Sequence, residues 1–227
     1  MVGYYTEKLS AGRLKKVYDL APPRVRQYLE AEIEFVLAGI GPGDRTLELG
    51  AGYGRVLGRL IAKTPRVYGI DLALDSLALA GRLLPGLAPG RLLVMDAADL
   101  AFRDESFDKV VCVQNGASAF HVDPVRLFRE AARVLRPGGS AFFSSYSASF
   151  WPHRLDWFRL QSQHGLLGRI DEQATGGGVI VCEDGFRAVT FSPDDFRAAT
   201  GSLGLTAALT EVDGSSLFCE IVKKSAP

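Results

Sequence analysis

The chain has 227 residues, 47% of them apolar, and its 26 basic and 26 acidic side chains give a formal net charge of zero. That length fits one domain with an elaboration, and the neutral balance provides no field that would attract nucleic acid or an anionic membrane. The first residues lack the apolar stretch of a leader, and no apolar run approaches a membrane span. Three widely spaced cysteines indicate neither a disulfide framework nor a zinc site. We therefore expect a cytoplasmic protein without a metal.

Predicted helices and strands alternate from about residue 22 onward. Pro22-Pro23 starts a helix that continues to about residue 38. Predicted strands then lie at about 45–49, 66–71, 91–95, 108–113 and 139–145, with predicted helices at about 54–63, 74–83 and 123–135. This alternation is typical of a doubly wound α/β fold with a parallel sheet. Two last strands, at about 204–212 and 215–223, meet at Asp213-Gly214 and predict an antiparallel hairpin.

A long segment after the fifth strand, residues 146–191, is not needed by a parallel α/β core. Its pattern predicts a helix at about 152–164 and then a hairpin. A loop this long inside a compact domain is usually functional, and this one leaves the sheet where ligands bind in such folds. We interpret residues 146–191 as an inserted substrate lid, and residues 1–145 and 192–227 as the main domain.

The first predicted strand leads into a glycine-rich turn. The strand contains Glu48, and the alternating glycines Gly50, Gly52 and Gly54 follow before the pattern becomes helical. Glycines allow a sharp backbone turn, and the helix start offers free N–H groups to a ligand. A dinucleotide fingerprint, G-x-G-x-x-G, would need a glycine where Arg55 stands, and Glu48 would repel a diphosphate. The glycine spacing and Glu48 together exclude a nicotinamide enzyme. The acid at position 48 favours a ligand that carries an ammonium group.

The next three strands also end in polar residues. Asp71 ends the second strand about 20 residues after the glycines, where an open α/β sheet places a carboxylate that accepts ribose hydroxyls. The third strand ends in Asp96-Ala97, and the fourth leads into Gln114-Asn115-Gly116. The alternative role for both aspartates is a strand-end turn or a helix cap.

The run E-x-G-x-G-x-G, these strand ends and a Pro-Gly-Gly turn before the fifth strand resemble the class I S-adenosylmethionine (SAM) dependent methyltransferases over about residues 40–146. The resemblance is to the small-molecule type, with a core similar to that of the ubiquinone and menaquinone methyltransferases. It implies a Rossmann-like seven-stranded sheet, mostly parallel with a C-terminal antiparallel hairpin, helices on both faces, and SAM as the cofactor. The cofactor-binding residues that it implies are Glu48, Gly50, Ala51, Gly52, Gly54, Asp71, Leu72, Asp96, Ala97, Gln114, Asn115 and Gly116.

The loop after the fourth strand is the best location for substrate chemistry. It lacks the N-P-P-Y or D-P-P-Y sequence used by enzymes that methylate exocyclic base amines, which argues against a DNA enzyme. His121 is its candidate catalytic residue, because an imidazole changes charge near neutral pH and can act as a general base. The alternative is that His121 is a turn residue before the helix cap at Asp123.

The beginning of the lid concentrates aromatic and basic side chains. The candidate substrate-binding residues are Tyr146, Trp151, His153 and Arg154. Such residues suit an aromatic box around a cationic amine. They equally suit a small helix that docks on the core through bulky side chains.

We expect an enzyme that transfers the methyl group of SAM to a nitrogen, oxygen or sulfur atom of a small molecule by in-line displacement, with no nucleic-acid or membrane partner. Two alternatives stay open: methylation of RNA or of a protein, and a non-catalytic SAM-binding module that regulates a partner. One predicted helix face bears on the first alternative, because its arginines suit either RNA binding or a solvated surface. These residues are Arg126, Arg129, Arg133 and Arg136.

Overall fold

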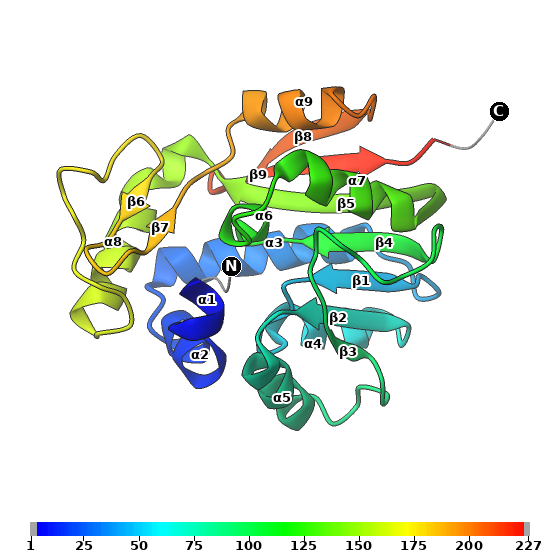
Figure 1. Cartoon of the computed structure of the whole chain (residues 1–227), viewed down its shortest axis with the longest axis horizontal. Coiled ribbons are helices and arrows are strands. Elements are labelled where there is room, and N and C mark those ends of the chain that lie inside the picture. Colours follow the sequence, from blue (N-terminus) through cyan, green and yellow to red (C-terminus); the bar gives the residue numbers. More distant parts are fainter. Residues whose placement is uncertain (1–3, 225–227) are drawn as a thin grey trace.

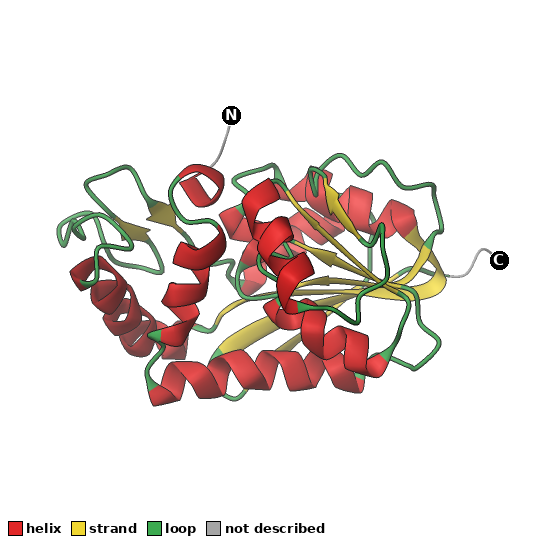
Figure 2. Ribbon diagram, turned by 90° about the horizontal axis from the view of Figure 1, so that it is seen from below, coloured by secondary structure: helices red, strands yellow, loops and turns green. Residues whose placement is uncertain are grey.

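The structure, a computed structural model, describes residues 4–224 and consists of a seven-stranded sheet between helices, with a smaller lobe at one end (Figures 1 and 2). The strands are β1 (Thr46–Leu49), β2 (Val67–Asp71), β3 (Leu92–Val94), β4 (Phe107–Cys112), β5 (Leu135–Tyr146), β6 (Ile180–Val181), β7 (Arg187–Ala188), β8 (Ala207–Val212) and β9 (Ser216–Val222). The helices are α1 (Tyr4–Glu7), α2 (Ala11–Asp19), α3 (Pro23–Ala38), α4 (Arg55–Lys63), α5 (Leu74–Leu83), α6 (Gly116–Ala119), α7 (Pro124–Val134), the 3-10 turn η1 (Ala148–Phe150), α8 (Trp151–Gln163) and α9 (Pro193–Gly201). None of the helices between residues 4 and 224 combines the length and the apolar character that a membrane span requires.

The strand order of the main sheet is β3-β2-β1-β4-β5-β9-β8. β1 to β5 are parallel, and β9 runs antiparallel to both β5 and β8. This arrangement confirms the predicted Rossmann-like sheet with a C-terminal antiparallel hairpin. The chain adds strands outward from β1 to β3 and then returns to place β4 on the other side of β1. Ligands in open α/β sheets bind outside the carboxyl ends of the strands at such a reversal.

Hydrophobic clusters cover both faces of the sheet, as Figure 2 shows for the two helix layers. On β5, Phe142 belongs to the cluster that includes α3 and α4, and Phe143 belongs to the cluster that includes α7 and α9. Successive residues of a strand point to opposite faces. The continuous apolar runs of the sequence therefore come from strands that are covered on both sides.

The fifth strand is longer than predicted, which shortens the helix before it. α7 ends at Val134 and β5 begins at Leu135, not at about residue 139. Pro137 disfavours helical backbone in the residue before it, and the pairing with β4 shifts register early in the strand, as at a bulge. The prediction that Arg136 shares a helix face with Arg126 was therefore wrong, because Arg136 lies on β5.

The smaller lobe lies beside the carboxyl ends of the parallel strands (Figure 1). It combines α8 and the β6–β7 hairpin with α1 and α2, two helices that the sequence pattern did not predict, around a third hydrophobic cluster. The indole Nε1 of Trp157 donates to the carbonyl oxygen of Val17 at 3.2 Å, across 140 residues of sequence. The hydroxyl of Tyr4 donates to Asp184 at 2.5 Å. The segment 146–191 thus packs against the amino-terminal helices.

A buried carboxylate connects the long helix α3 to two strands. Glu32 is fully buried, and its Oε2 accepts the backbone N–H of Gln114 at 3.0 Å while its Oε1 accepts the hydroxyl of Ser216 at 2.9 Å. Burial raises the pKa of Glu32 to about 7, and its hydrogen bonds oppose that rise only in part. Glu32 therefore fixes the loop after β4. Because its pKa lies near physiological pH, the buried carboxyl changes its charge in that range, and its charged form is destabilised by burial.

The stability of the protein should depend on the protonation of Glu32. Its pKa is raised from 4.5 to about 7, so its contribution to stability is fully present below pH 4.5 and is lost as the pH rises through about 7. The difference corresponds to about 3 kcal/mol of unfolding free energy. We expect Glu32→Gln, which stays neutral and keeps an acceptor oxygen, to flatten this loss in urea unfolding measured across that pH range.

The matched control is Glu30→Gln on the same helix, because Glu30 is exposed and pairs with Arg59. This variant should keep the pH dependence of the wild type. The same slope in the wild type and in Glu32→Gln would contradict the assignment of the titration to Glu32.

Candidate active site

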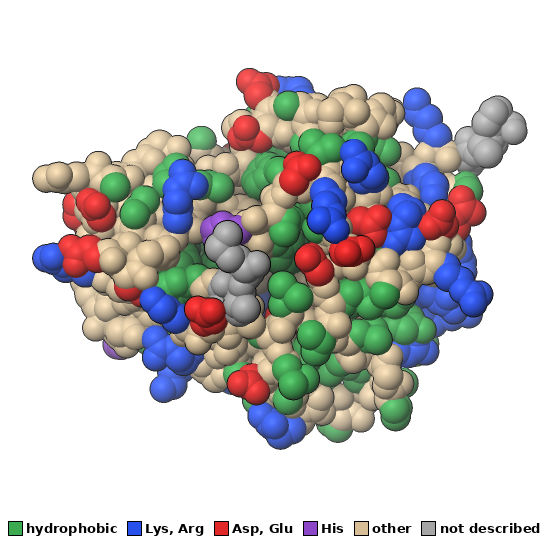
Figure 3. Space-filling view, in the orientation of Figure 1, with side chains coloured by type: hydrophobic (Ala, Val, Ile, Leu, Met, Phe, Trp, Pro, Cys, Tyr) green, Lys and Arg blue, Asp and Glu red, His purple; other side chains and the backbone are tan. Residues whose placement is uncertain are grey.

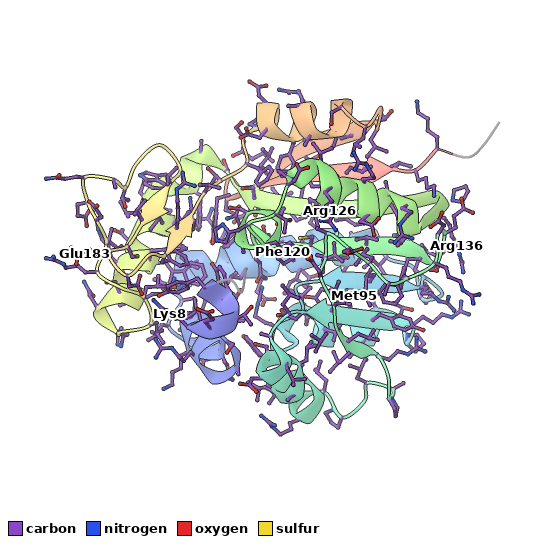
Figure 4. The ribbon with its side chains drawn as sticks, in the orientation of Figure 1. Lys8, Met95, Phe120, Arg126, Arg136 and Glu183 are labelled. Carbon is purple, nitrogen blue, oxygen red and sulfur yellow. The ribbon has the colours of Figure 1, made fainter. Side chains whose placement is uncertain are left out.

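The glycine loop between β1 and α4 is a close-fitting backbone turn. Gly50 and Gly54 have φ angles of 74° and 87°, in the left-handed region that glycine adopts without strain. A Cβ atom at Gly50 would lie 2.8 Å from the ring of Phe120, and one at Gly54 would lie 2.6 Å from Leu84. Ala51 is buried between them. The backbone of this loop is therefore approached closely from two sides, and Figure 4 shows Phe120 between the sheet and the smaller lobe.

Asp71 fastens the glycine loop to β2. Its Oδ2 accepts the backbone N–H of Gly52 at 2.9 Å, and its Oδ1 accepts that of Ala73 at 2.8 Å. Burial raises the pKa of Asp71, and these backbone donors oppose the rise. Asp71 therefore has the strand-end turn role that the sequence analysis gave as its alternative. Each carboxylate oxygen has a second lone pair, so the same group retains acceptor capacity for a ribose diol.

The other predicted adenosine contacts lie at the ends of β2 and β3. Asp96 accepts the backbone N–H of Ala98 at 2.8 Å, which is the strand-end turn considered above, and Ala97 is buried. Leu72, in contrast, is 51% exposed. Figure 3 shows apolar side chains gathered on the surface over α5 and β3. An exposed apolar side chain next to Asp71 fits the predicted contact with a flat base, and the contact itself stays a prediction.

Two ionisable side chains beside the loop have buried atoms without hydrogen-bond partners. Glu48 on β1 is 4% exposed, and its Oε2 has no hydrogen-bond partner. The buried Nε and Nη2 of Arg55, at the start of α4, also have none, and its guanidinium lies 4.9 Å from the ring centre of Tyr18. Burial raises the pKa of Glu48 well above its usual range, although the positive charge of Arg55 lowers it. Unpaired buried charges are costly, so these atoms indicate a ligand that brings the missing groups.

The motif analysis missed Arg55 as a binding residue, because it treated the position only as a break in the dinucleotide pattern. One signal was available in the sequence. A basic side chain in the first turn of a helix interacts unfavourably with the helix dipole. Its presence at position 55 therefore indicates a role other than helix stabilisation, such as ligand binding.

The loop after β4 has an uncommon backbone conformation. Gln114 and Asn115 have φ angles of 58° and 60°, which residues other than glycine seldom adopt. The Oδ1 of Asn115 accepts the hydroxyl of Ser145, and its Nδ2 donates to the carbonyl oxygen of Val189, each at 2.8 Å. Gly116 then starts α6. The loop is therefore held by β5 and by the end of the lid, beside the glycine loop that Phe120 contacts.

Three of the four predicted substrate residues converge where β5 leads into segment 146–191. Arg154 and Tyr146 are buried, and the guanidinium of Arg154 lies 4.5 Å from the ring centre of Tyr146 and 5.6 Å from that of Trp151. His153 does not join them, because it is exposed on α8. The rings that were expected to surround a cationic amine surround the cation of Arg154 itself.

His121 lies just after α6, directly behind Phe120 in the chain. It is exposed, its φ angle is 53°, and its backbone N–H donates to the carbonyl oxygen of Ser118 at 3.3 Å. This backbone conformation is that of a turn residue. His121 lies near the glycine loop because Phe120, the residue before it, packs against Gly50. Its role as a general base stays a prediction. Between residues 4 and 224, no three His, Cys, Asp or Glu side chains are grouped to hold a metal ion.

The unpartnered groups fit the amino-acid end of SAM, which carries an ammonium and a carboxylate. The ammonium matches the carboxylate of Glu48, and the carboxylate matches the guanidinium of Arg55, so the buried atoms would be satisfied together. α2 lies over the same loop, since a Cβ atom at Gly52 would lie 3.1 Å from Leu14. The donors and acceptors present are thus those that SAM requires.

Comparisons with known proteins agree with this geometry. Residues 47–143 match the family described as Methyltransferase domain. A malonyl-[acyl-carrier protein] O-methyltransferase from Marinomonas sp. is 31% identical over 66% of this chain and 58% of its own length. An arsenite methyltransferase from Aquipseudomonas alcaligenes is 35% identical over 47% of this chain and 34% of its own. The chain thus spans little more than half of the first relative and about a third of the second.

A solved SAM-dependent methyltransferase from Methanosarcina mazei shares the fold, with a TM-score of 0.61 at 19% identity over 85% of this chain and 98% of that one. Residues 47–143 thus match a methyltransferase domain, the chain has the fold of a SAM-dependent methyltransferase, and the cofactor that these likenesses and the site imply is SAM.

The contribution of the two unpaired charges can be measured with S-adenosylhomocysteine. Glu48→Gln and Arg55→Gln should each weaken its binding at least about tenfold, because each removes a charge-assisted pair worth roughly 1.5–3 kcal/mol. Calorimetry gives the affinities directly. NAD should not bind, because the carboxylate of Glu48 would repel its diphosphate.

Arg59→Gln is the matched control, one turn further along α4, where Arg59 is partly exposed and pairs with Glu30. It should bind S-adenosylhomocysteine as the wild type does. Unchanged affinity in both Glu48→Gln and Arg55→Gln would show that these groups serve another purpose.

Proposed function

We propose that this protein transfers the methyl group of SAM to a nitrogen, oxygen or sulfur nucleophile of a small molecule. SAM, when bound, supplies a methyl carbon attached to a positively charged sulfur. Displacement at such a carbon disperses charge, so an oxyanion hole has little to stabilise. The main tasks of the protein are therefore to position the reactants and to exclude water.

The enclosure of the site is the observation that carries this proposal. The ring of Tyr18 on α2 lies 5.9 Å from that of Tyr53 in the glycine loop and 6.1 Å from that of Trp157 on α8. Three separate parts of the chain thus meet around the candidate active site. A small acceptor fits under such a cover, whereas a folded RNA or protein needs an open approach. We infer that residues 146–191 act as the substrate lid of the main domain.

The surface charge supports a partner other than nucleic acid. Arg126 lies 3.3 Å from Asp99 and Arg136 lies 3.0 Å from Asp108, each in an ion pair, and Arg133 pairs with two carboxylates. Figure 4 shows Arg136 well apart from Arg126, near one end of the sheet. Acidic and basic side chains are interspersed on the face in Figure 3. A basic surface suited to phosphates would need unpaired cations close together.

Within this proposal, each residue has a defined task. Glu48 and Arg55 hold the amino-acid end of the cofactor, and Asp71 accepts the ribose hydroxyls. Asn115 keeps the loop after β4 in place through its bonds to Ser145 and Val189. His121 accepts the proton that a neutral amine, thiol or hydroxyl must lose.

The relatives named above have different acceptors in their names, a malonyl-[acyl-carrier protein] and arsenite. Transfer to arsenic is disfavoured here, because all three cysteines of the chain are buried and separate. Burial also raises the pKa of Cys182 to about 11. A thiolate that would bind arsenic is thus not offered by this chain.

A transfer assay distinguishes the proposed function from its alternatives. The protein is incubated with methyl-labelled SAM and, separately, a small-metabolite extract, total RNA and a protein extract. We expect label in the small-metabolite fraction. Label in RNA or protein alone would establish the macromolecular alternative, and binding of SAM without transfer to any pool would indicate the regulatory module.

His121→Asn tests the proposed base. An anchored imidazole beside the reaction centre contributes typically 10²–10⁴-fold to proton transfer. The variant should therefore lose about that factor in turnover, keep the SAM affinity of the wild type, and lose the acid limb of the pH–rate profile. His164→Asn, at the exposed end of α8, serves as the control. A loss below about threefold would return His121 to the role of a turn residue.

A further inference from the structure

Arg154 is a buried cation whose binding groups are only partly used. Its side chain is 0% exposed, and its Nη1 donates to the carbonyl oxygen of Gly178 at 2.8 Å. Its Nε and Nη2 have no hydrogen-bond partner. No carboxylate among residues 4–224 forms an ion pair with it. The protein therefore supplies one acceptor to a group with five N–H donors.

The surroundings of Arg154 are aromatic. The guanidinium lies 4.5 Å from the ring centre of Tyr146, 5.4 Å from that of Phe158 and 5.6 Å from that of Trp151. Burial lowers the pKa of Arg154, and nearby tyrosines oppose this. Cation–π contacts offset only part of the desolvation of a guanidinium, which keeps its charge in proteins.

The two unpartnered nitrogens form one edge of the guanidinium. Nε–H and one Nη2–H are parallel, at the spacing of the two oxygens of a carboxylate, and such pairs are bidentate. Gln161 lies seven residues later on α8, so it shares the same helix face. It is 2% exposed, and its Nε2 also has no partner. Two buried side chains of one helix face thus present donors without acceptors.

We propose that the free edge of Arg154 binds a carboxylate of the substrate beneath the lid. This inference rests on the proposed function and adds the chemical class of the acceptor molecule to it. A single cation balances a single negative charge, which favours a carboxylate over a phosphate dianion. The aromatic rings around the guanidinium suit an apolar body attached to that carboxylate.

Aromatic contacts connect this position to the cofactor end of the site. Tyr146 ends β5, and Trp157 lies one turn after Arg154 on α8. The ring of Trp157 is 6.1 Å from that of Tyr18, and the guanidinium of Arg55 is 4.9 Å from that same Tyr18 ring. The ring of Phe158, which the Arg154 guanidinium contacts, lies 6.0 Å from that of Trp157, so a continuous aromatic layer joins Arg154 to Arg55. A substrate anchored at Arg154 would extend toward the cofactor along this layer.

Binding of carboxylates to the protein saturated with S-adenosylhomocysteine tests the proposal. The probes are acetate, benzoate and decanoate, each compared with its neutral amide, and phenyl phosphate. We expect at least one carboxylate to bind ten or more times tighter than its amide and, for benzoate, tighter than phenyl phosphate. Arg154→Gln should abolish the preference for the carboxylate. Arg159→Gln should preserve it, because Arg159 lies on the same helix and pairs with Glu172 at the surface.

Equal binding of acids and amides by the wild type would overturn the proposal, as would a preference that survives in Arg154→Gln. Tighter binding of phenyl phosphate would replace the carboxylate with a phosphate. If Arg154→Gln does not fold, the Nε–H resonances of the arginines in the wild type provide the readout. A buried arginine resonance should shift with a bound carboxylate and not with its amide, and an unshifted spectrum would also overturn the proposal.

A transfer assay separates this inference from the proposed function. A small-metabolite extract is divided by anion exchange into acidic and non-acidic fractions, and each is offered with methyl-labelled SAM. Label in the acidic fraction supports the inference. Label only in the non-acidic fraction would overturn the carboxylate and leave small-molecule methylation standing, whereas label only in RNA or protein would overturn both.

Discussion

The burial of ionisable side chains whose polar atoms lack hydrogen-bond partners is the constraint on which the rest of this structure depends. Glu48 lies in the middle of the sheet and Arg55 at the start of the next helix, and both present buried polar atoms without partners. Elsewhere in the site the protein satisfies its own carboxylates, since Asp71 and Glu32 accept backbone and hydroxyl donors. Glu48 and Arg55 therefore differ from these carboxylates, and they define which end of the ligand the domain binds.

The smaller lobe repeats this arrangement around a second cation. Arg154 is buried among aromatic rings with one acceptor, and Tyr18 lies between that region and Arg55. Because ligands that bind only the folded state add to its stability, cofactor and substrate would both stabilise the fold in which α2 and α8 lie over the site. The contacts of Tyr18 thus contribute both to the packing of the amino-terminal helices on the lid and to the site where the chemistry is proposed.

The sheet and the glycine loop could be predicted from the sequence because their signals are local. Continuous apolar runs, alternating glycines and acids at strand ends each lie within a few residues. The burial of Arg154 could not, because the face of α8 that is buried contains Arg154 and Gln161 as well as Trp157. Nor could the packing of α1 and α2 on the lid, which joins residues 140 positions apart. At β5, the Pro-Gly-Gly turn was read as a loop although it lies within the strand.

The central claim is that the unpaired charges of Glu48 and Arg55 await the amino-acid end of SAM. The most direct measurement compares, by calorimetry, the binding of S-adenosylhomocysteine and of 5′-methylthioadenosine, which keeps the adenosine and the sulfur but lacks the ammonium and the carboxylate. Two charge-assisted pairs at roughly 1.5–3 kcal/mol each predict that S-adenosylhomocysteine binds at least about a hundredfold tighter. Equal affinities for the two ligands would contradict the claim.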